Sequence, residues 1–300
     1  MVCPKPRISV AVVLCLLYVP HIHAQTSISS IPDGFAAGEE PTHHIKLEIL
    51  NYPGAASSEA LGINDSGVIV GQYFLPRASS SGYVLADGVF SDVSYPGAAA
   101  TSADGVNAVG DIVGSYVDSL GQGHAFLDRG GAFSSLDFPG GTDTVASGIN
   151  ADDQIVGLYR DADGISHGFF YDAGEFTTID FPGATSSALL GINSAGQITG
   201  YWNDSKGQTH GLLYWRGRFA KFDFPGASYT VAYGLNDRGE IVGWFNESTG
   251  HGYFWHRGKF SLFDSPKALH SQPTAINNNR QVVGAFSADG STVGFLAAPE

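Results

Sequence analysis

Histidines at one recurring place in the chain are the first candidates for chemistry. Each of them opens a short apolar segment: His124, His167, His210 and His251. Imidazole side chains ligate metals and act as general bases, so these histidines would form a metal or catalytic centre if they converged. Side chains on separate repeat units stand too far apart to share one metal at ligand distances of about 2 Å. We therefore expect each histidine to hold a neighbouring turn.

Amide and carboxylate side chains recur at the same interval, and their surroundings indicate structural roles. One set precedes tight turns, where Asx side chains cap backbone N–H groups: Asn64, Asn107, Asn150, Asn193, Asn236 and Asn277. A second set comes just before a recurring proline turn, and we expect it to bind the backbone of that turn: Asp137, Asp180, Asp223 and Asp264.

Metal and cofactor motifs are weak or missing in this sequence. The segment Asp161-Ala162-Asp163-Gly164 is similar to the start of a calcium loop, but the later ligands and the bidentate glutamate are missing. No Gly-rich phosphate loop, His-Glu-x-x-His motif or Gly-x-Ser-x-Gly elbow occurs. We predict neither a metal site nor a cofactor.

The candidate ligand-binding residues are found where the repeat units differ from one another. Residues that all units share build the fold, whereas residues that break the pattern at one place can build a site. Such residues fall between the proline turn and a recurring glycine, on a segment expected to rim a central channel: Glu59, Asp104, Asp143, Tyr229, Tyr233 and His270. A hydroxyl occurs in every unit beside them, so we expect a ring of hydroxyls: Ser58, Thr101, Thr144, Ser187, Thr230 and Ser271. A polar funnel of this kind suits a neutral or cationic ligand such as a sugar.

These candidates are positioned by a unit that occurs six times. Its prolines are 43, 43, 43, 43 and 41 residues apart. The motif around them is Tyr52-Pro53-Gly54, Tyr95-Pro96-Gly97, Phe138-Pro139-Gly140, Phe181-Pro182-Gly183, Phe224-Pro225-Gly226 and a degenerate Ser265-Pro266-Lys267. Each unit divides into four short β-branched and aromatic runs separated by Gly or Asx; in the fourth unit these are 188–193, 197–202, 210–215 and 219–224. Four strands in about 40 residues are typical of a propeller blade.

The two ends of the repeat region predict how the ring closes. The sixth unit stops after its third strand, at 293–297, whereas an extra strand at 45–51 precedes the first unit. The extra strand is expected to complete the last blade and to remove two open sheet edges. The fold prediction is therefore an all-β, six-bladed β-propeller of four-stranded antiparallel blades over residues 45–300, closed by its N-terminal strand.

The repeated pattern resembles one known family. "GIN..G.IVG.Y…HGF….G.F..IDFPGA", clearest at 148–184 and 191–227, is similar to the HAF family of predicted bacterial extracellular repeat proteins. The resemblance covers residues 45–297. It implies export and a repeated architecture, and it brings no activity and no catalytic residues.

The N-terminus has the composition of a secretory signal peptide. Lys5 and Arg7 precede a short apolar stretch at 8–19, and a tolerable cleavage site lies before Gln25. We predict a signal peptide at 1–24 and a flexible leader at 25–44. No other stretch is long and apolar enough to cross a membrane.

Cysteine use and charge narrow the remaining classes. Both cysteines, Cys3 and Cys15, would leave with the signal peptide, so the mature chain would be secreted without disulfides. The net charge of −14 at pH 7 disfavours nucleic acid and anionic lipid as partners. We expect a monomer.

The function expected from the sequence is a secreted, non-enzymatic binding module, with a glycan or a cell-surface partner held at the central funnel. The alternative is a secreted glycan hydrolase or lyase that uses acids and His or Tyr at the same funnel. A third hypothesis is a surface repeat that mediates contacts through exposed aromatic residues. Near-identical blades favour binding, since an enzyme would concentrate its irregular residues in one sector.

Overall fold

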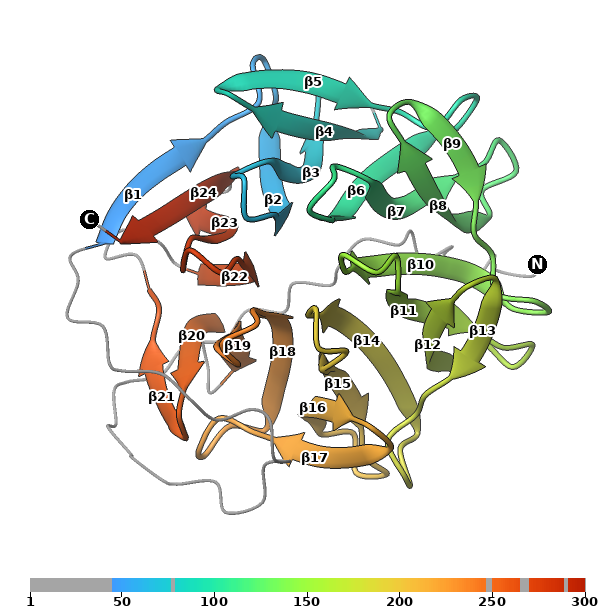
Figure 1. Ribbon diagram of the computed structural model, residues 1–300, viewed down its shortest axis with the longest axis vertical. Helices are drawn as coiled ribbons and strands as arrows, with labels where there is room; N and C mark the ends of the chain where they lie inside the picture. Colours follow the sequence, from blue (N-terminus) through green and yellow to red (C-terminus); the bar gives the residue numbers. More distant parts are fainter. Residues whose placement is uncertain (1–44, 77–78, 247–249, 265–269, 289–290, 300) are drawn as a thin grey trace, which may run out of the picture.

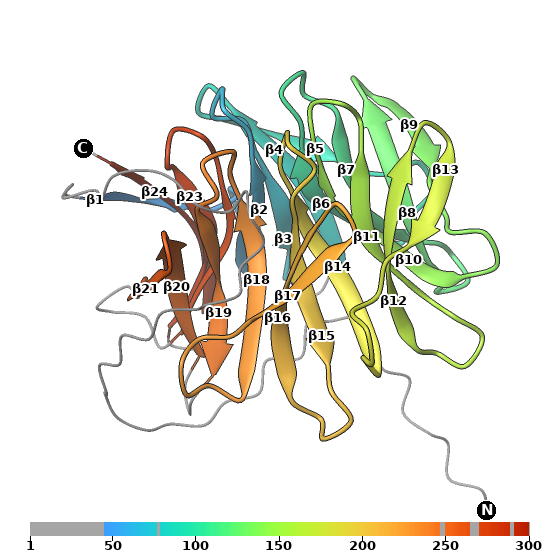
Figure 2. The same cartoon turned by 60° about the horizontal axis from the view of Figure 1, so that its bottom comes forward.

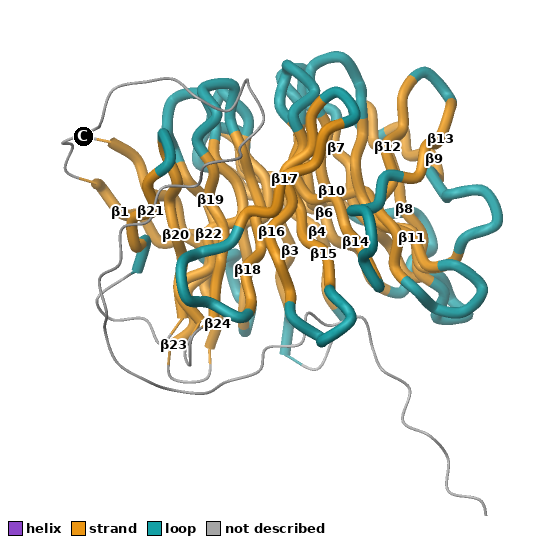
Figure 3. Tube along the Cα trace, turned by 90° about the horizontal axis from the view of Figure 1, so that it is seen from below, coloured by secondary structure: helices purple, strands orange, loops and turns teal. Residues whose placement is uncertain are grey.

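The computed structural model describes residues 45–76, 79–246, 250–264, 270–288 and 291–299. The predicted signal peptide and leader lie outside the described residues. The described residues form strands joined by turns, without a helix, and the loops gather at the two faces of the molecule (Figure 3). No helical segment with the length and hydropathy needed to span a bilayer is found among them.

Strands that follow one another in the sequence pair antiparallel. The first sheet contains β2 (Ser57–Ile63), β3 (Ile69–Phe74), β4 (Ser80–Ala86) and β5 (Val89–Val93). The second contains β6 (Ala100–Val106), β7 (Ile112–Val117), β8 (Gly123–Arg129) and β9 (Ala132–Ser135). The third contains β10 (Thr142–Ile149), β11 (Ile155–Arg160), β12 (Ser166–Asp172) and β13 (Glu175–Thr178).

The next sheet has eight strands and consists of two antiparallel halves. Its first half is β14 (Ser186–Ile192), β15 (Ile198–Asn203), β16 (Thr209–Trp215) and β17 (Arg218–Phe222). Its second half is β18 (Tyr229–Leu235), β19 (Ile241–Asn246), β20 (Gly250–His256) and β21 (Lys259–Leu262). A single parallel pair, Thr209 with Tyr229, joins the halves, and the N–H of Thr209 donates to the carbonyl of Ser228 at 3.3 Å.

The last sheet combines the two ends of the described chain. It contains β22 (His270–Ile276), β23 (Val282–Ala288), β24 (Ser291–Pro299) and β1 (Ile45–Leu50). β1 pairs antiparallel with β24, with Leu47 opposite Ala297. Figure 2 shows the two strands side by side, although they lie at opposite ends of the sequence.

The sheets stand around a common axis (Figure 1). The first strand of each four-strand set, from β2 to β22, lies nearest the axis, and the fourth strands lie at the periphery. The prediction of an all-β chain built from four-stranded antiparallel sheets is confirmed. The residue pair that joins two of the sets was not predicted.

Glycines allow the inner strands to approach one another closely. A β-bulge lies at Gly62, where an added Cβ would be 2.9 Å from the carbonyl oxygen of Asp104 on the next inner strand. Gly191 has the same setting, with the carbonyl of Tyr233 at 2.6 Å. A side chain at either position would force neighbouring inner strands apart.

The aromatic ring of each proline turn stacks on an aromatic ring of the second strand in its own sheet. The ring centroids are 3.7 Å apart for Tyr52 and Tyr73, 3.6 Å for Phe138 and Tyr159, and 4.1 Å for Phe181 and Trp202. Two of the repeated sequence columns are therefore a single packing contact, which explains why they recur together.

The ring of hydroxyls predicted for the funnel has a different role. Thr144 is buried and its Oγ1 accepts the N–H of Phe138 at 3.2 Å, and Thr230 does the same for Phe224 at 3.1 Å. A hydroxyl six residues after the turn is needed because the turn leaves this N–H without a sheet partner. These hydroxyls fix the proline turns.

The recurring asparagines cap turns, as predicted, and also connect the sheets. Oδ1 of Asn193 accepts the N–H groups of Ala195 and Gln197, while its Nδ2 donates to the carbonyl of Asn236 in the next set of strands. The same bond runs from Asn277 to the carbonyl of Asn64 at 2.9 Å, across 213 positions of sequence. The last sheet is thereby bonded to the first.

Candidate functional site

Each repeated histidine contacts the aspartate before the next proline turn, and three of the four contact a second aspartate as well. Nδ1 of His167 lies 2.6 Å from Asp180 and Nε2 lies 3.1 Å from Asp161. Burial disfavours the charged imidazole, but the bonds to Asp180 and Asp161 outweigh it, so the pKa of His167 is raised. Corresponding pairs occur at the other three positions: His124 with Asp137 and Asp118, His210 with Asp223 and Asp204, and His251 with Asp264.

The aspartates before the proline turns have other partners than predicted. Oδ1 of Asp180 accepts the N–H of Gly168 on β12, while Oδ2 bonds to His167. The partner is therefore the third strand of the same sheet, not the backbone of the proline turn. The carboxylate of Asp161 is likewise occupied, because it accepts the N–H groups of Asp163 and Ile165. The described residues include no cluster of three or more His, Cys, Asp or Glu side chains that would hold a metal ion.

Two of the predicted ligand-binding residues line a small cavity near the axis. Glu59 on β2 and His270 on β22 face it, and its volume is about 30 Å³. The other lining residues are Trp244, Gln272, Ala285, Ser287 and Thr292. Nδ1 of His270 accepts the N–H of Gly250 at 3.2 Å, so Nε2 carries the hydrogen. That buried Nε2 has no partner among the described residues.

Two predicted tyrosines lie beside this cavity. The hydroxyl of Tyr233 accepts a bond of 2.8 Å from Gln272, and the ring of Tyr229, 37 % exposed, packs edge-on against Trp244. Burial raises the pKa of both hydroxyls. The structure thus brings Glu59, Tyr229, Tyr233 and His270 to one region.

Asp104 on β6 is coupled to the same region through its charge. Burial raises its pKa to about 7, against the effect of hydrogen bonds from Ser102 and Ser115, and the charge of Glu59 raises it further. Asp143 is separate. It lies on β10, across the axis from β22 (Figure 1), and its carboxylate accepts the N–H of Gly123 on the neighbouring sheet.

The size of the axial cavity limits what it can hold. About 30 Å³ fits one water molecule or one hydroxyl group, whereas ligand pockets usually exceed about 300 Å³. Asp143 and His270 have a further role, because each bonds a backbone N–H of the preceding sheet. Ligand binding by the six residues stays a prediction.

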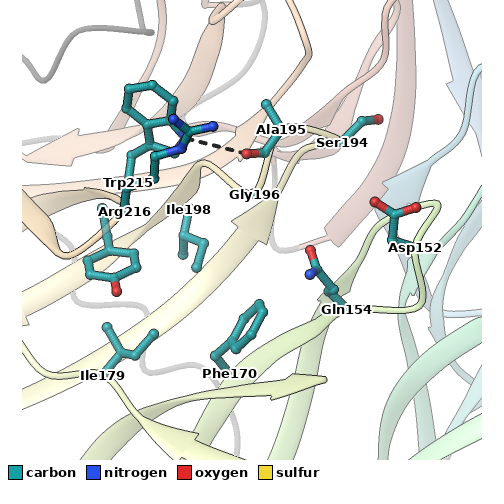
Figure 4. A pocket seen from close by; sticks show the side chains of 11 residues that line it. Asp152, Gln154, Phe170, Ile179, Ser194, Ala195, Gly196, Ile198, Trp215 and Arg216 are labelled. Carbon is teal, nitrogen blue, oxygen red and sulfur yellow. Dashed lines mark hydrogen bonds between the residues drawn. The ribbon is translucent and has the colours of Figure 1, made fainter. Parts of the chain in front are cut away.

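A larger pocket opens between the third sheet and the next set of strands. Its volume is about 360 Å³ (Figure 4). Phe170 and Ile179 come from the third sheet, and Ile198 faces them from β15. The polar or aromatic lining residues are Asp152, Gln154, Ser194, Tyr214, Trp215 and Arg216. Sequence reasoning missed this pocket.

Two residues of the β16–β17 hairpin form one side of the pocket. The indole Nε1 of Trp215 donates to the carbonyl of Ala195 at 3.3 Å, and the guanidinium of Arg216 lies 4.6 Å from the indole centroid. In Figure 4 these two side chains lie across the pocket from Asp152. Arg216 is exposed and takes a positive φ of 49°.

The sequence contained a signal for this site that the comparison of inner strands did not use. The residue at the place of Trp215 on the third strand differs among the first five sets: Ala86, Arg129, Asp172, Trp215 and His256. A lone tryptophan followed by an arginine in such a column indicates a surface that differs from its neighbours.

Comparisons with known proteins support the fold. The SapL1 lectin in complex with α-methyl fucoside has a TM-score of 0.55 at 11 % identity, over 81 % of this chain and 93 % of that one. A mutant of the Aleuria aurantia lectin in complex with Fucα1-6GlcNAc has a TM-score of 0.50 at 10 % identity, over 80 % and 91 % of the two chains.

A third similar structure is TolB from Acinetobacter baumannii. Its TM-score is 0.55 at 14 % identity, and the match covers 73 % of this chain and 54 % of that one. No protein-family model and no curated protein matches the chain. At these identities the likeness concerns the fold alone, which is that of a β-propeller.

Proposed function

We propose that this protein is a non-enzymatic carbohydrate-binding module whose site is the 360 Å³ pocket between the third sheet and β14–β16. The pocket carries the proposal because it combines an apolar floor with polar groups at its rim. Sugars present both an apolar ring face and hydroxyl groups, and aromatic side chains with a few fixed polar groups are what bind them. Trp215 and Phe170 supply the aromatic surface, and Asp152 and Ser194 supply acceptors.

The architecture that carries this site is a six-bladed closed propeller. Its eight-stranded sheet counts as two blades, since one residue pair alone joins the antiparallel halves. Closure is supported by the pairing of β1 with β24 and by the bond from Asn277 to Asn64. Two similar structures are lectins in complex with fucosides, which favours a sugar as ligand. Export of the chain and membership of the HAF family belong to the same proposal.

The test is an array of immobilised neutral and acidic glycans, fucosides included, followed by titration calorimetry on the hits. The native chain is expected to bind at least one glycan, and Trp215→Ala to weaken it at least tenfold while its melting temperature stays within a few degrees. Loss of one buried aromatic or polar partner typically costs about 1–3 kcal/mol of binding. Arg218→Ala on the same hairpin is the control. The proposal fails if no glycan binds, or if folded Trp215→Ala binds like the native chain.

A second candidate function is supported by two acids at the axis. The pKa of Asp104 is raised to about 7 beside Glu59, and glycoside hydrolysis uses one carboxyl held protonated and one ionised. Incubating every bound glycan with the protein and measuring new reducing ends tests this candidate. Turnover that is lost in Asp104→Asn would establish a hydrolase, and unchanged glycans would exclude it.

A further inference from the structure

Ion pairs close two of the boundaries between neighbouring sets of strands. Arg129 of the second sheet contacts Asp153 of the third sheet at 2.8 Å, and Asp111 of its own sheet at 3.1 Å. Between the eight-stranded sheet and the last sheet, Arg280 contacts Glu240 at 2.8 Å. In both cases a long or charged side chain from the turn of the next set reaches across the boundary.

At the boundary that contains the large pocket, the turn position equivalent to Asp153 and Arg280 is occupied by a glycine. Gly196 lies 43 residues after Asp153 and takes a φ of 72°, close to the 60° of Asp153 and the 61° of Arg280. Asp153 and Arg280 each place a side chain in their boundary, whereas Gly196 has no side chain to place there. Gly196 lines the pocket. The side chain that bridges the boundary at Asp153 and at Arg280 is therefore missing at the boundary that contains the pocket.

A cation remains at this open boundary. Arg216 lines the pocket and makes no ion pair with any described residue; its guanidinium contacts the face of Trp215. Across the pocket from Arg216, the carboxylate of Asp152 is exposed, and the lining residue Gln154 donates a bond to Asp172. The pocket thus has a cationic end and an acceptor end, with apolar side chains between them.

We infer that the pocket binds an acidic saccharide, a uronate unit whose carboxylate pairs with Arg216. This inference rests on the proposed carbohydrate-binding function and names the ligand class of that site. A planar guanidinium binds a carboxylate through two parallel N–H···O bonds, and its stacking on Trp215 holds its plane in place. Hydroxyl groups at the far end of the sugar donate to Asp152, and the ring face packs on Phe170. Fucosides lack this carboxylate, so they bind more weakly than uronates.

The experiment uses a uronic-acid oligosaccharide and the same oligosaccharide with its carboxyl groups reduced to alcohols. Titration calorimetry with the full chain is expected to give at least tenfold tighter binding of the acidic form, with an affinity that falls as salt rises. Arg216→Ala is expected to abolish the preference and the salt dependence while retaining weak binding of both sugars. Arg257→Ala, which changes the equivalent exposed arginine of the β20–β21 hairpin, is the matched control and keeps native behaviour.

The possible results distinguish a failure of the acidic-ligand inference from a failure of the proposed carbohydrate-binding function. Equal or tighter binding of the reduced sugar overturns the inference and leaves carbohydrate binding in place, as does an undiminished preference in Arg216→Ala. If inorganic sulfate competes as strongly as the oligosaccharide, the pocket is a general anion site, and the inference of a uronate ligand is also overturned. If neither sugar binds and the glycan array is blank, the proposed function fails as well.

Discussion

At the scale of single residues, the repeated histidines stabilise the fold, whereas Trp215, which differs from its counterparts in the other sets, has a partly exposed side chain. His167 is fixed on both nitrogens by Asp180 and Asp161 and stacks on Tyr159, so it has no free atom for a ligand. Trp215 does not recur at its position in the other sets, and it and Arg216 keep partly exposed surfaces. Comparing the repeat units at every strand, and not at the inner strands alone, would have pointed to the column that contains Trp215.

The pairing of His167 predicts a dependence of stability on pH. Because its pKa is raised in the folded chain, the imidazolium contributes stability that is fully present below the unfolded pKa of about 6.5 and is lost as pH rises through the folded pKa. Melting temperatures of the native chain and of His167→Gln, measured from pH 5 to 9, are expected to differ most at the acid end. A difference that grows toward pH 9 would contradict the role given to Asp180 and Asp161.

At the scale of elements, strands and turns were predictable because local rules act on them. Gly and Asx at the turns and aromatic residues between them place the ends of 188–193 within two residues of β14, and 45–51 within one residue of β1. The roles of Thr144 and Asp180 were not predictable in this way, since both depend on which N–H a folded turn leaves without a partner. The pocket depends on the space between sheets, which no single unit encodes.

The boundary beside Gly196 yields a prediction at this scale. Gly196→Asp restores the residue that the preceding boundary has at Asp153, and an added Cβ would meet no atom within 4 Å. The positive φ makes the change cost about 1–2 kcal/mol of stability. The new carboxylate is expected to project into the pocket, pair with Arg216 and abolish glycan binding. Denaturant unfolding and calorimetry on the same sample measure the two effects.

Gly239→Asp is the control for that change, since Gly239 holds the equivalent position 43 residues later. It is expected to cost similar stability and to leave the affinity for glycan unchanged. Retained binding in folded Gly196→Asp would mean that the ligand occupies another surface, and the axial residues Glu59 and His270 would become the next candidates.

At the scale of the whole molecule, the ring is held together by contacts between distant parts of the sequence. Asn277 and Asn278 bond to Asn64 and Asp65 across 213 positions, and Thr274 donates to the carbonyl of Ala60 across 214. The pairing of β1 with β24 was predictable from the count of strands, because a missing fourth strand at one end matched an extra strand at the other. The polar contacts of Asn277, Asn278 and Thr274 were not predictable, since they join residues that only the folded chain brings together.

Removal of the N-terminal strand tests this architecture. A chain that begins at Asn51 loses β1, so the edge of β24 loses all six of its pairs and exposes unpaired N–H and C=O groups. Leu50, only 4 % exposed in the folded chain, leaves a gap in the core that it forms with Ala60 and Tyr83. We expect a melting temperature lower by ten degrees or more and concentration-dependent aggregation in light scattering.

A chain that begins at Ile45 is the control, because it lacks the predicted signal peptide and leader but retains β1. It is expected to melt within a degree or two of the chain that begins at Gln25. Adding a synthetic peptide of residues 45–50 to the shorter chain should recover part of the lost stability, since the peptide can pair with β24 and supply Leu50. If the chain that begins at Asn51 melts at the same temperature as the control, β1 does not close the ring. The propeller would then be held by Asn277 and Asn64 without the help of the first strand.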